Sequence, residues 1–430
     1  EIKSNQLFTE NSYYLDLLLD DEEKSLSVVG AIIYINDEPT NELDLKIYPN
    51  TITTNDNDIV DINYIKVNGE VKLASFSGND RTTIHLEFDN EIQENEEVFI
   101  EFSYSFDYWN EGRIAYYNNY YITMFFYPFV AMRTDYPLET YDYSFIGESY
   151  YNGIGDYFVS IDVPIDFEIA SSGKEIETIE ESNRVVKNYY LNNGRDFSFS
   201  ASSLYNIYEK EIDGITQTIY SIEALTDYEV QENFYTLENS FRIYQDYVGE
   251  YPYDYFNLEF GNIYGMESSG IVYCSSDISI YTVVHEIIHQ WFYSIIHNDQ
   301  ANEPFLDEAL TTYTTFIYFY EVEGLEFANG YLDYRSSLKT GFEDYLETYR
   351  GLSLLENVEA YEQGYAYIIY YHGPTLYRYY FNELFGSDVT VLKQFLNAYY
   401  DTYSFKEVTT QEMLELLEKI TGYENTVEWF

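Results

Sequence analysis

The stretch from His285 to Glu308 constrains this chain more than any other, and it reads HEIIHQWFYSIIHNDQANEPFLDE. Its first five residues form the pattern H-E-x-x-H. Residues four apart lie on one face of a helix, so His285 and His289 would direct two imidazoles at one point. Glu286 would act on a water molecule rather than bind the metal. Glu308, separated from His289 by eighteen residues, would be a third ligand and leave one open position. The spacing predicts a catalytic zinc site with one Zn²⁺ per chain.

This pattern is specific, because the chain has only five histidines and chance would produce H-E-x-x-H about 0.01 times in such a chain. The alternative is an ordinary amphipathic helix whose histidines are satisfied by hydrogen bonds. The flanking apolar residues are those of a buried helix: Val283, Val284, Ile287, Ile288, Trp291 and Phe292. Buried ionisable groups are costly without a strong partner, and zinc would be that partner.

The length and charge of the chain limit its class. A chain of 430 residues is expected to form two or three domains. Its hydrophobic content of 46% is ample for packed cores, which argues against disorder. The formal net charge is −55, with 76 acidic residues against 21 basic ones. Such a surface repels nucleic acid and anionic membranes and favours cationic partners. Adaptation to high salt and an acidic secreted protein would both account for this charge.

Cysteine content and apolar runs bear on the compartment. Cys274 is the only cysteine, which excludes an intramolecular disulfide and a cysteine-based metal site. The longest apolar run, near residues 120–132, is too short to span a bilayer and is broken by Pro128. The sequence starts at Glu1 without a methionine, so we expect a processed or truncated product, in which a removed export signal would not be visible. An extracellular or cell-surface location is therefore expected.

The first half of the chain has the alternating pattern of β-strands. From Tyr13 to about Tyr205, short segments such as LSVVGAIIYIN, IVDINYIKV and EEVFIEFSYSF are separated by turn residues. Asn68 and Gly69, between IKV and EVKL, are a strong hairpin signal. Residues 1–205 are therefore predicted to form an all-β domain, a sandwich or a saddle, and none of its residues is predicted to be catalytic.

The second half, residues 206–430, is predicted to be mainly helical. A strand pair near TQTIYSIEA leads into the helical stretch VQENFYTLENSFRIYQDYVG, and YFNLEFGNI is a further strand. YGMESSG follows, and a glutamate between glycines and serines usually means only a turn. Helical segments continue to the end, where TTQE before MLELL predicts a capping box. Because no linker separates the two domains, we expect a tight interface between them.

Several of these motifs resemble one family. HEIIHQWF with Glu308 resembles the gluzincin aminopeptidases, the aminopeptidase N-type zinc metallopeptidases. YGMESSG is similar to their G-x-M-E-N motif, and PFLDEALTTY to their W-L-N/D-E-G-x-A-x-Y. The resemblance covers nearly the whole chain. The chain is most similar in organisation to truncated, two-domain members of bacterial or archaeal type. It implies an N-terminal β-saddle domain and a thermolysin-like catalytic domain. The later β-sandwich and helical domains of longer members have no counterpart here, and VEWF ends the chain where relatives usually continue.

The resemblance implies roles for individual residues. His285, His289 and Glu308 would bind zinc, and Glu286 would be the general base and then the proton shuttle. Glu267 matches the glutamate that holds the free α-amino group of the substrate. The backbone of the adjoining Gly265 and Met266 would align the peptide. The sequence departs from the family at two positions, with Tyr264 in place of the usual first glycine and Ser268 in place of asparagine.

The family also uses a tyrosine hydroxyl to stabilise the oxyanion of the tetrahedral intermediate. That tyrosine usually stands in Y-x-K-G and opens a helix that ends in L-G. Tyr361 in YEQG matches the local motif better. Tyr371 lies fifteen residues before Gly386, as in the family's helix, and its distance from His285 also fits. Tyr371 is therefore the preferred catalytic tyrosine and Tyr361 the alternative.

These features lead to a first hypothesis and two alternatives. The first is a zinc-dependent aminopeptidase that releases N-terminal residues from peptides with a free N-terminus. The second is a zinc endopeptidase with an open cleft, since the surroundings of Glu267 differ from the family pattern. The third is a structural or surface-binding module that kept the fold and lost activity. The side-chain preference at the first substrate position, the physiological substrate and the oligomeric state do not follow from the sequence.

Overall fold

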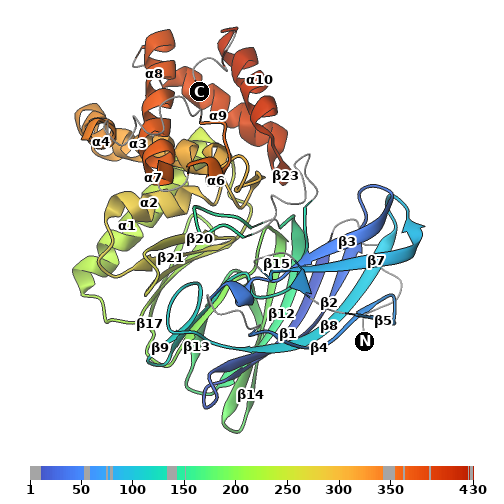
Figure 1. Cartoon of the computed structure of the whole chain (residues 1–430). Coiled ribbons are helices and arrows are strands. Elements are labelled where there is room, and N and C mark those ends of the chain that lie inside the picture. Colours follow the sequence, from blue (N-terminus) through green and yellow to red (C-terminus); the bar gives the residue numbers. More distant parts are fainter. Residues whose placement is uncertain are drawn as a thin grey trace.

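The computed structural model describes residues 11–52, 59–73, 76–77, 81–132, 143–150, 152–341, 354–361, 364–386, 389–424, 426 and 430. The helices gather at one end of the molecule and the large β-sheets at the other, with β20 and β21 between them (Figure 1). The predicted fold class is confirmed: an N-terminal β-rich domain is followed by a mainly helical one. No helix in the described part of the chain has the length and apolar character needed to cross a membrane.

The N-terminal domain is built around an eight-stranded sheet. Its strands lie in the order β14 (Lys174–Glu181), β15 (Arg184–Gly194), β12 (Gly155–Pro164), β1 (Ser12–Asp20), β2 (Ser25–Ile35), β8 (Glu97–Asp107), β4 (Asp61–Val67) and β5 (Glu70–Lys72). β1 is parallel to β12, and the other neighbouring pairs are antiparallel. Burial alternates along β8 with a period of two, so one face packs on the core. Asn68 and Gly69 have φ angles of 49° and 84° and join β4 to β5, which confirms the predicted hairpin.

Two smaller sheets complete this domain. One contains β13 (Glu168–Ser171), β16 (Phe199–Ser202), β10 (Tyr120–Thr123) and β9 (Ile114–Tyr117). The other contains β11 (Phe129–Val130), β3 (Thr40–Lys46), β7 (Thr83–Ile92) and β6 (Phe76–Ser77), and η1 (Pro49–Ile52) is a short 3-10 helix. Some buried tyrosines of this domain bond through their hydroxyls: Tyr127 donates to Tyr157 at 3.0 Å, and Tyr104 donates to the carbonyl oxygen of Phe126 at 2.5 Å. Tyrosine can therefore fill this core while its hydroxyl keeps a polar partner.

The second domain starts with a five-stranded sheet that leads to the predicted metal helix. Its order is β17 (Asn206–Ile212), β18 (Ile215–Ser221), β19 (Tyr255–Gly261), β21 (Ile271–Ser275) and β20 (Gly265–Ser268). β18, β19 and β21 are parallel to one another, whereas β20 is an antiparallel edge strand. The edge strand β20 therefore carries the Gly265–Met266–Glu267 segment beside the helices.

Helices cover the sheet and form the remainder of the domain. They are α1 (Asp227–Tyr247), α2 (Ile280–Ile288), α3 (Leu310–Val322), α4 (Leu325–Gly341), α6 (Val358–Tyr361), α7 (Tyr365–Tyr367), α8 (Gly373–Phe385), α9 (Thr390–Tyr403) and α10 (Thr410–Thr421), with the short pair β22 (Ile296–His297) and β23 (Lys406–Glu407). Thr409 and Glu412 form the predicted capping box of α10, and Gly422 ends that helix at φ 68°. Two π-helical segments, η3 (Phe305–Ala309) and η5 (Ile368–His372), interrupt the α-helical pattern.

Candidate active site

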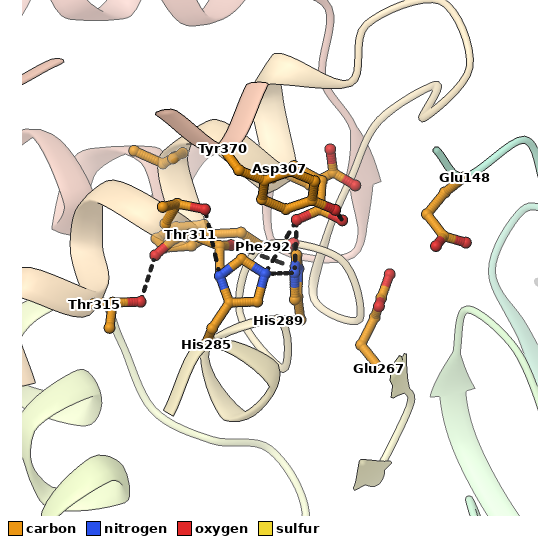
Figure 2. A network of polar contacts seen from close by, with 12 residues as sticks. Glu148, Glu267, His285, His289, Phe292, Asp307, Thr311, Thr315 and Tyr370 are labelled. Atoms are coloured by element: carbon orange, nitrogen blue, oxygen red, sulfur yellow. Dashed lines mark hydrogen bonds and ion pairs between the residues drawn. The ribbon is translucent and has the colours of Figure 1, made fainter. Parts of the chain in front are cut away.

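Three side chains converge where α2 meets η3. Nε2 of His285 lies 3.1 Å from Nε2 of His289 and 3.1 Å from Oε2 of Glu308. Nε2 of His289 lies 3.4 Å from the same carboxylate oxygen. Figure 2 shows both imidazoles turned toward this point. The helix therefore brings the two histidines together as their spacing predicts, and the segment η3 adds the predicted third residue.

The protonation of these groups fits a cation between them. Nδ1 of His289 donates to the carbonyl oxygen of Phe292 at 3.0 Å, so in the neutral ring the lone pair lies on Nε2, where it can bind a metal. The two Nε2 atoms face each other at 3.1 Å beside the Glu308 carboxylate, so the three groups can direct their lone pairs at one cation. Zinc bonds of about 2.0–2.1 Å in a tetrahedral site would place ligand atoms roughly 3.3 Å apart, close to the observed separations. The donor set therefore fits Zn²⁺ with His285, His289 and Glu308 as its ligands.

The wide turn of η3 sets the direction of Glu308. This segment follows Pro304 and closes a π-helical turn before α3 begins at Leu310. Such single π turns are frequent at functional sites because they redirect a side chain within a helix. Burial opposes the ionisation of Glu308. The charge of His289 and the hydrogen bonds with both histidines outweigh this effect and hold the pKa of Glu308 below its usual range.

Glu286 lies in the same buried region and does not belong to the three-residue ligand set. Burial raises the pKa of its carboxyl well above the usual range, and the charges of Glu267 and Glu308 add to this rise. A Cβ atom on Gly265 would come within 2.5 Å of Oε1 of Glu286. Glycine at position 265 therefore leaves room for this carboxylate, a more specific role than alignment of a peptide by its backbone.

Glu267 lies next to the metal-binding residues on β20. Carboxylate oxygens of Glu267 and Glu286 and a ring nitrogen of His289 all lie within 4.8 Å of one another. Nε2 of Gln300 donates to Oε1 of Glu267 at 3.2 Å. The side chain of Met266 is buried in the hydrophobic core and is absent from the described lining of the cavity, so its contact with a substrate would be through the backbone.

Residues of the N-terminal domain hold the strand that carries Glu267. The carboxylate of Asp196 accepts hydrogen bonds from the hydroxyl of Ser268 and from the backbone N–H of Ser269, the latter at 2.8 Å. Ser198 also donates to the Ser268 hydroxyl, at 2.6 Å. Serine at position 268, where the family has asparagine, is therefore part of a buried network that joins the two domains.

Glu148 is a residue of this site that sequence reasoning missed. It belongs to the segment 143–150 of the N-terminal domain, and its carboxylate forms a paired hydrogen bond with the Arg113 guanidinium. Figure 2 shows Glu148 and Glu267 facing each other to one side of the histidines. Burial raises the pKa of Glu148 to about 7, against the effect of Arg113. The expectation that the β-domain contributes nothing to the site is therefore corrected. No sequence pattern distinguishes Glu148, because folding alone brings it here.

A tyrosine adjacent to the predicted one approaches the ligands. The Tyr370 hydroxyl donates to Oε1 of Glu308 at 2.7 Å, and its ring centre lies 6.0 Å from that of His285. Tyr371 also lines the cavity, but its ring packs with Tyr367. Tyr361 is buried and accepts a backbone hydrogen bond from Glu356 at 3.1 Å. Of these three tyrosines, Tyr370 is therefore the one for which the described structure gives a hydroxyl contact with a predicted metal ligand.

The sequence held a signal for Tyr370. Tyr370 precedes Gly373 by three residues, the same Y-x-x-G spacing that Tyr361 has with Gly364, whereas the count back from Gly386 favoured Tyr371. A Cβ atom on Gly373 would lie 2.5 Å from the Cβ of Ala309. Glycine therefore lets η5 approach η3 closely enough for Tyr370 to reach Glu308.

A cavity of about 690 Å³ contains these groups. Its described lining is Glu148, Tyr264, Gly265, Glu267, Ser279, Tyr281, Thr282, His285, Glu286, Glu308, Tyr331, Tyr334, Arg335, Leu338, Tyr370 and Tyr371. Four carboxylates and several tyrosine rings dominate this lining. The site thus combines a metal-binding group, a buried carboxyl next to it, and a pair of carboxylates to one side.

Comparison with known proteins agrees with this geometry. Residues 241–430 match the family model described as the peptidase family M1 domain. Residues 241–430 therefore contain a peptidase family M1 domain. A curated relative, Aminopeptidase RNPEPL1 of Homo sapiens, is 30% identical over 154 residues, which cover 33% of this chain. The match spans only 20% of that relative's length.

Solved M1 structures share the two-domain fold. A point mutant of the M1 zinc metallopeptidase from Deinococcus radiodurans superimposes with a TM-score of 0.69 and 13% identity, covering 96% of this chain and 91% of that one. The same enzyme bound to a Tyr-Ser-Ala substrate gives a TM-score of 0.67, with 13% identity and the same coverage of both chains. At this identity the likeness establishes the M1 fold.

Proposed function

We propose that this M1 peptidase is a zinc-dependent aminopeptidase, which removes the N-terminal residue from peptides. The observation that supports it most is the position of Glu267, whose carboxylate lies within 4.8 Å of Glu286 and His289. A carboxylate so close to the metal-binding residues can hold a cationic α-amino group one residue from the bond to be cut. The structure of a similar M1 metallopeptidase with a Tyr-Ser-Ala substrate supports peptides as the substrate class.

Glu148 strengthens this site for a cation. Its carboxylate faces Glu267 from the N-terminal domain (Figure 2), and Arg113 holds it in place through the paired hydrogen bond. Two carboxylates that face each other repel when both are ionised, and an ammonium group between them relieves that repulsion. A free N-terminus therefore contributes a charge that an acylated N-terminus lacks.

The other residues of the site would carry out different steps of peptide-bond hydrolysis. Zinc held by His285, His289 and Glu308 would polarise the scissile carbonyl and lower the pKa of a water molecule toward neutrality. The Glu286 carboxylate accepts the proton from the attacking water and later passes it to the leaving nitrogen, and its raised pKa suits it as a proton acceptor. The Tyr370 hydroxyl turns from Glu308 to donate a hydrogen bond to the oxyanion.

One comparison of substrates tests this function. Peptides with a free amine and the same peptides with an N-acetyl group are incubated with the enzyme, and the products are identified by mass spectrometry. We expect release of the first residue from the free peptide and about a hundredfold slower reaction, or none, with the acetylated form. Equal cleavage of both forms, or cuts within the chain, would reject the aminopeptidase and favour an endopeptidase.

A further inference from the structure

One positive charge stands out in the acidic cavity. Arg335 of α4 is the only Lys or Arg side chain among its described lining residues, which include the carboxylates of Glu148, Glu267, Glu286 and Glu308. A guanidinium costs free energy to place in a recess unless it has a partner. The other arginine near the site, Arg113, is already paired with Glu148. Arg335 therefore calls for a separate explanation.

The guanidinium of Arg335 is held by rings rather than by an acid. Its centre lies 5.2 Å from the ring centroid of Tyr331 and 5.9 Å from that of Tyr371. No carboxylate of the described residues lies within 4 Å of it, and its Nε atom is buried without a hydrogen-bond partner. The acidic residue nearest in sequence, Asp333, pairs instead with Arg378 at 2.7 Å. The aromatic rings thus orient the guanidinium, whose buried Nε donor lacks an acceptor among the described residues.

Arg335 and the two anchoring carboxylates belong to different walls of the cavity. Glu267 lies on β20 and Glu148 in the N-terminal domain, whereas Arg335 lies on α4 beside Tyr371 of η5, the segment that also carries Tyr370. A peptide with its amine at the glutamates and its first peptide bond at the metal ligands would continue toward the wall of α4 and η5.

We propose that Arg335 binds a carboxylate on the leaving-group side of the scissile bond. This inference rests on the proposed aminopeptidase function and narrows its substrate class. The carboxylate is either the C-terminus of a dipeptide or the side chain of Asp or Glu at the second position. A planar guanidinium binds either group with two parallel hydrogen bonds. The enzyme would thus recognise a positive charge and a negative charge on opposite sides of the bond that it cuts.

Four short substrates separate the two sources of the carboxylate. All begin with the residue that the enzyme releases fastest from simple amides, written X. X-Ala against X-Ala-amide tests the terminal carboxylate, and X-Glu-amide against X-Gln-amide tests the side chain. We expect kcat/KM to be about tenfold or more higher for the charged member of at least one pair, as for loss of a charge-assisted hydrogen bond.

Variants then assign that preference to Arg335. In Arg335→Gln the preference should disappear, so that the ratio of kcat/KM between the charged and the neutral member of the pair falls to about one. Arg335→Lys should keep part of the preference because the charge remains without the fork. Arg378→Gln, which removes a nearby arginine outside the described lining, should keep all of it.

Each result decides between the proposals. A preference within one pair only identifies which carboxylate is bound. Absence of any preference in wild type, or a preference that survives Arg335→Gln, overturns the role of Arg335 while the aminopeptidase stands. Failure of wild type to release X from any of the four substrates overturns the aminopeptidase and this inference together. An equal loss with all four substrates in Arg335→Gln would show a structural role and reject binding of a carboxylate.

Discussion

The hydroxyl of Tyr370 donates to Oε1 of Glu308 at 2.7 Å, while Oε2 of the same carboxylate faces His285 and His289. One carboxylate therefore links the metal ligands to the proposed oxyanion donor. In the absence of substrate this contact places the Tyr370 hydroxyl beside the metal position, where a developing negative charge would lie.

Tyr370→Phe should lower kcat by about 10²–10³-fold with little change in KM, because a donor that acts on the oxyanion is needed mainly in the transition state. Tyr371→Phe and Tyr361→Phe are matched controls with the same chemical change, and each should retain most of the activity. Steady-state kinetics on one peptide substrate measures all three variants. A large loss of kcat in Tyr371→Phe alone would return the role to that residue.

Glu286→Gln should lower kcat by about 10²–10⁴-fold, the range expected for loss of a general base. Zinc content should stay at one ion per chain, since Glu286 is outside the ligand set, and elemental analysis measures it. Turnover near the wild-type rate in a zinc-loaded variant would contradict the proposed role of this carboxylate.

Removal of the metal should also lower thermal stability. Without a cation, the facing imidazoles of His285 and His289, at 3.1 Å, lose the charge that holds them together. We expect dialysis against a chelator to lower the melting temperature and abolish activity, and added Zn²⁺ to restore both. An unchanged melting temperature in protein shown to have lost its zinc would contradict the claim that a metal bound by these ligands stabilises the fold.

Gly373→Ala should disturb the contact between η5 and η3, because the new Cβ would meet the Cβ of Ala309 at 2.5 Å. The expected result is a lower melting temperature and a lower kcat, since Tyr370 would move away from Glu308. Ala309→Gly combined with Gly373→Ala relieves the clash and should recover part of both losses relative to the two single variants. Simple addition of the single effects would show that this contact does not position Tyr370.

Glu259 should make folding stability depend on pH. Burial raises the pKa of this carboxyl from 4.5 to about 8, against the hydrogen bond from Tyr205. Below pH 4.5 the group is protonated in both states and contributes no difference. Between pH 4.5 and 8 the unfolded chain has released a proton that the folded chain retains, so each pH unit lowers the free energy of unfolding by about 1.4 kcal/mol.

Glu259→Gln removes this proton uptake while preserving the shape of the side chain. The stability of the variant relative to wild type should therefore rise steadily from pH 5 to pH 8, as measured by urea unfolding. A difference that stays constant across this range would show that Glu259 is ionised in the folded protein.

Local patterns explain what could be predicted from the sequence. The alternation along β8, the Asn68-Gly69 turn and the spacing of His285 and His289 each depend on residues close together in the chain, where period and turn chemistry act directly. Glu308 can be predicted as a metal ligand because PFLDEALTTY, the segment that contains it, is similar to a family motif. Glu148 could not be predicted, because its place in the cavity depends on how the segment 143–150 folds in space. A π turn in η5, whose extra residue shifts the register of the helix, accounts for the contact with Glu308 of Tyr370, a residue that the count back from Gly386 did not select.

Asp196 accepts hydrogen bonds from Ser268 and Ser269, and Ser198 donates one to Ser268. These bonds tie the strand that bears Glu267 to the N-terminal domain. The helical domain would supply the metal ligands and Glu286. The β-domain would fix the position of Glu267, which we propose binds the α-amino group of the peptide. A catalytic domain fused to the β-domain of another relative could then keep its rate of hydrolysis and lose its preference for peptides with a free N-terminus. In such a hybrid, altered selectivity would precede any loss of chemistry.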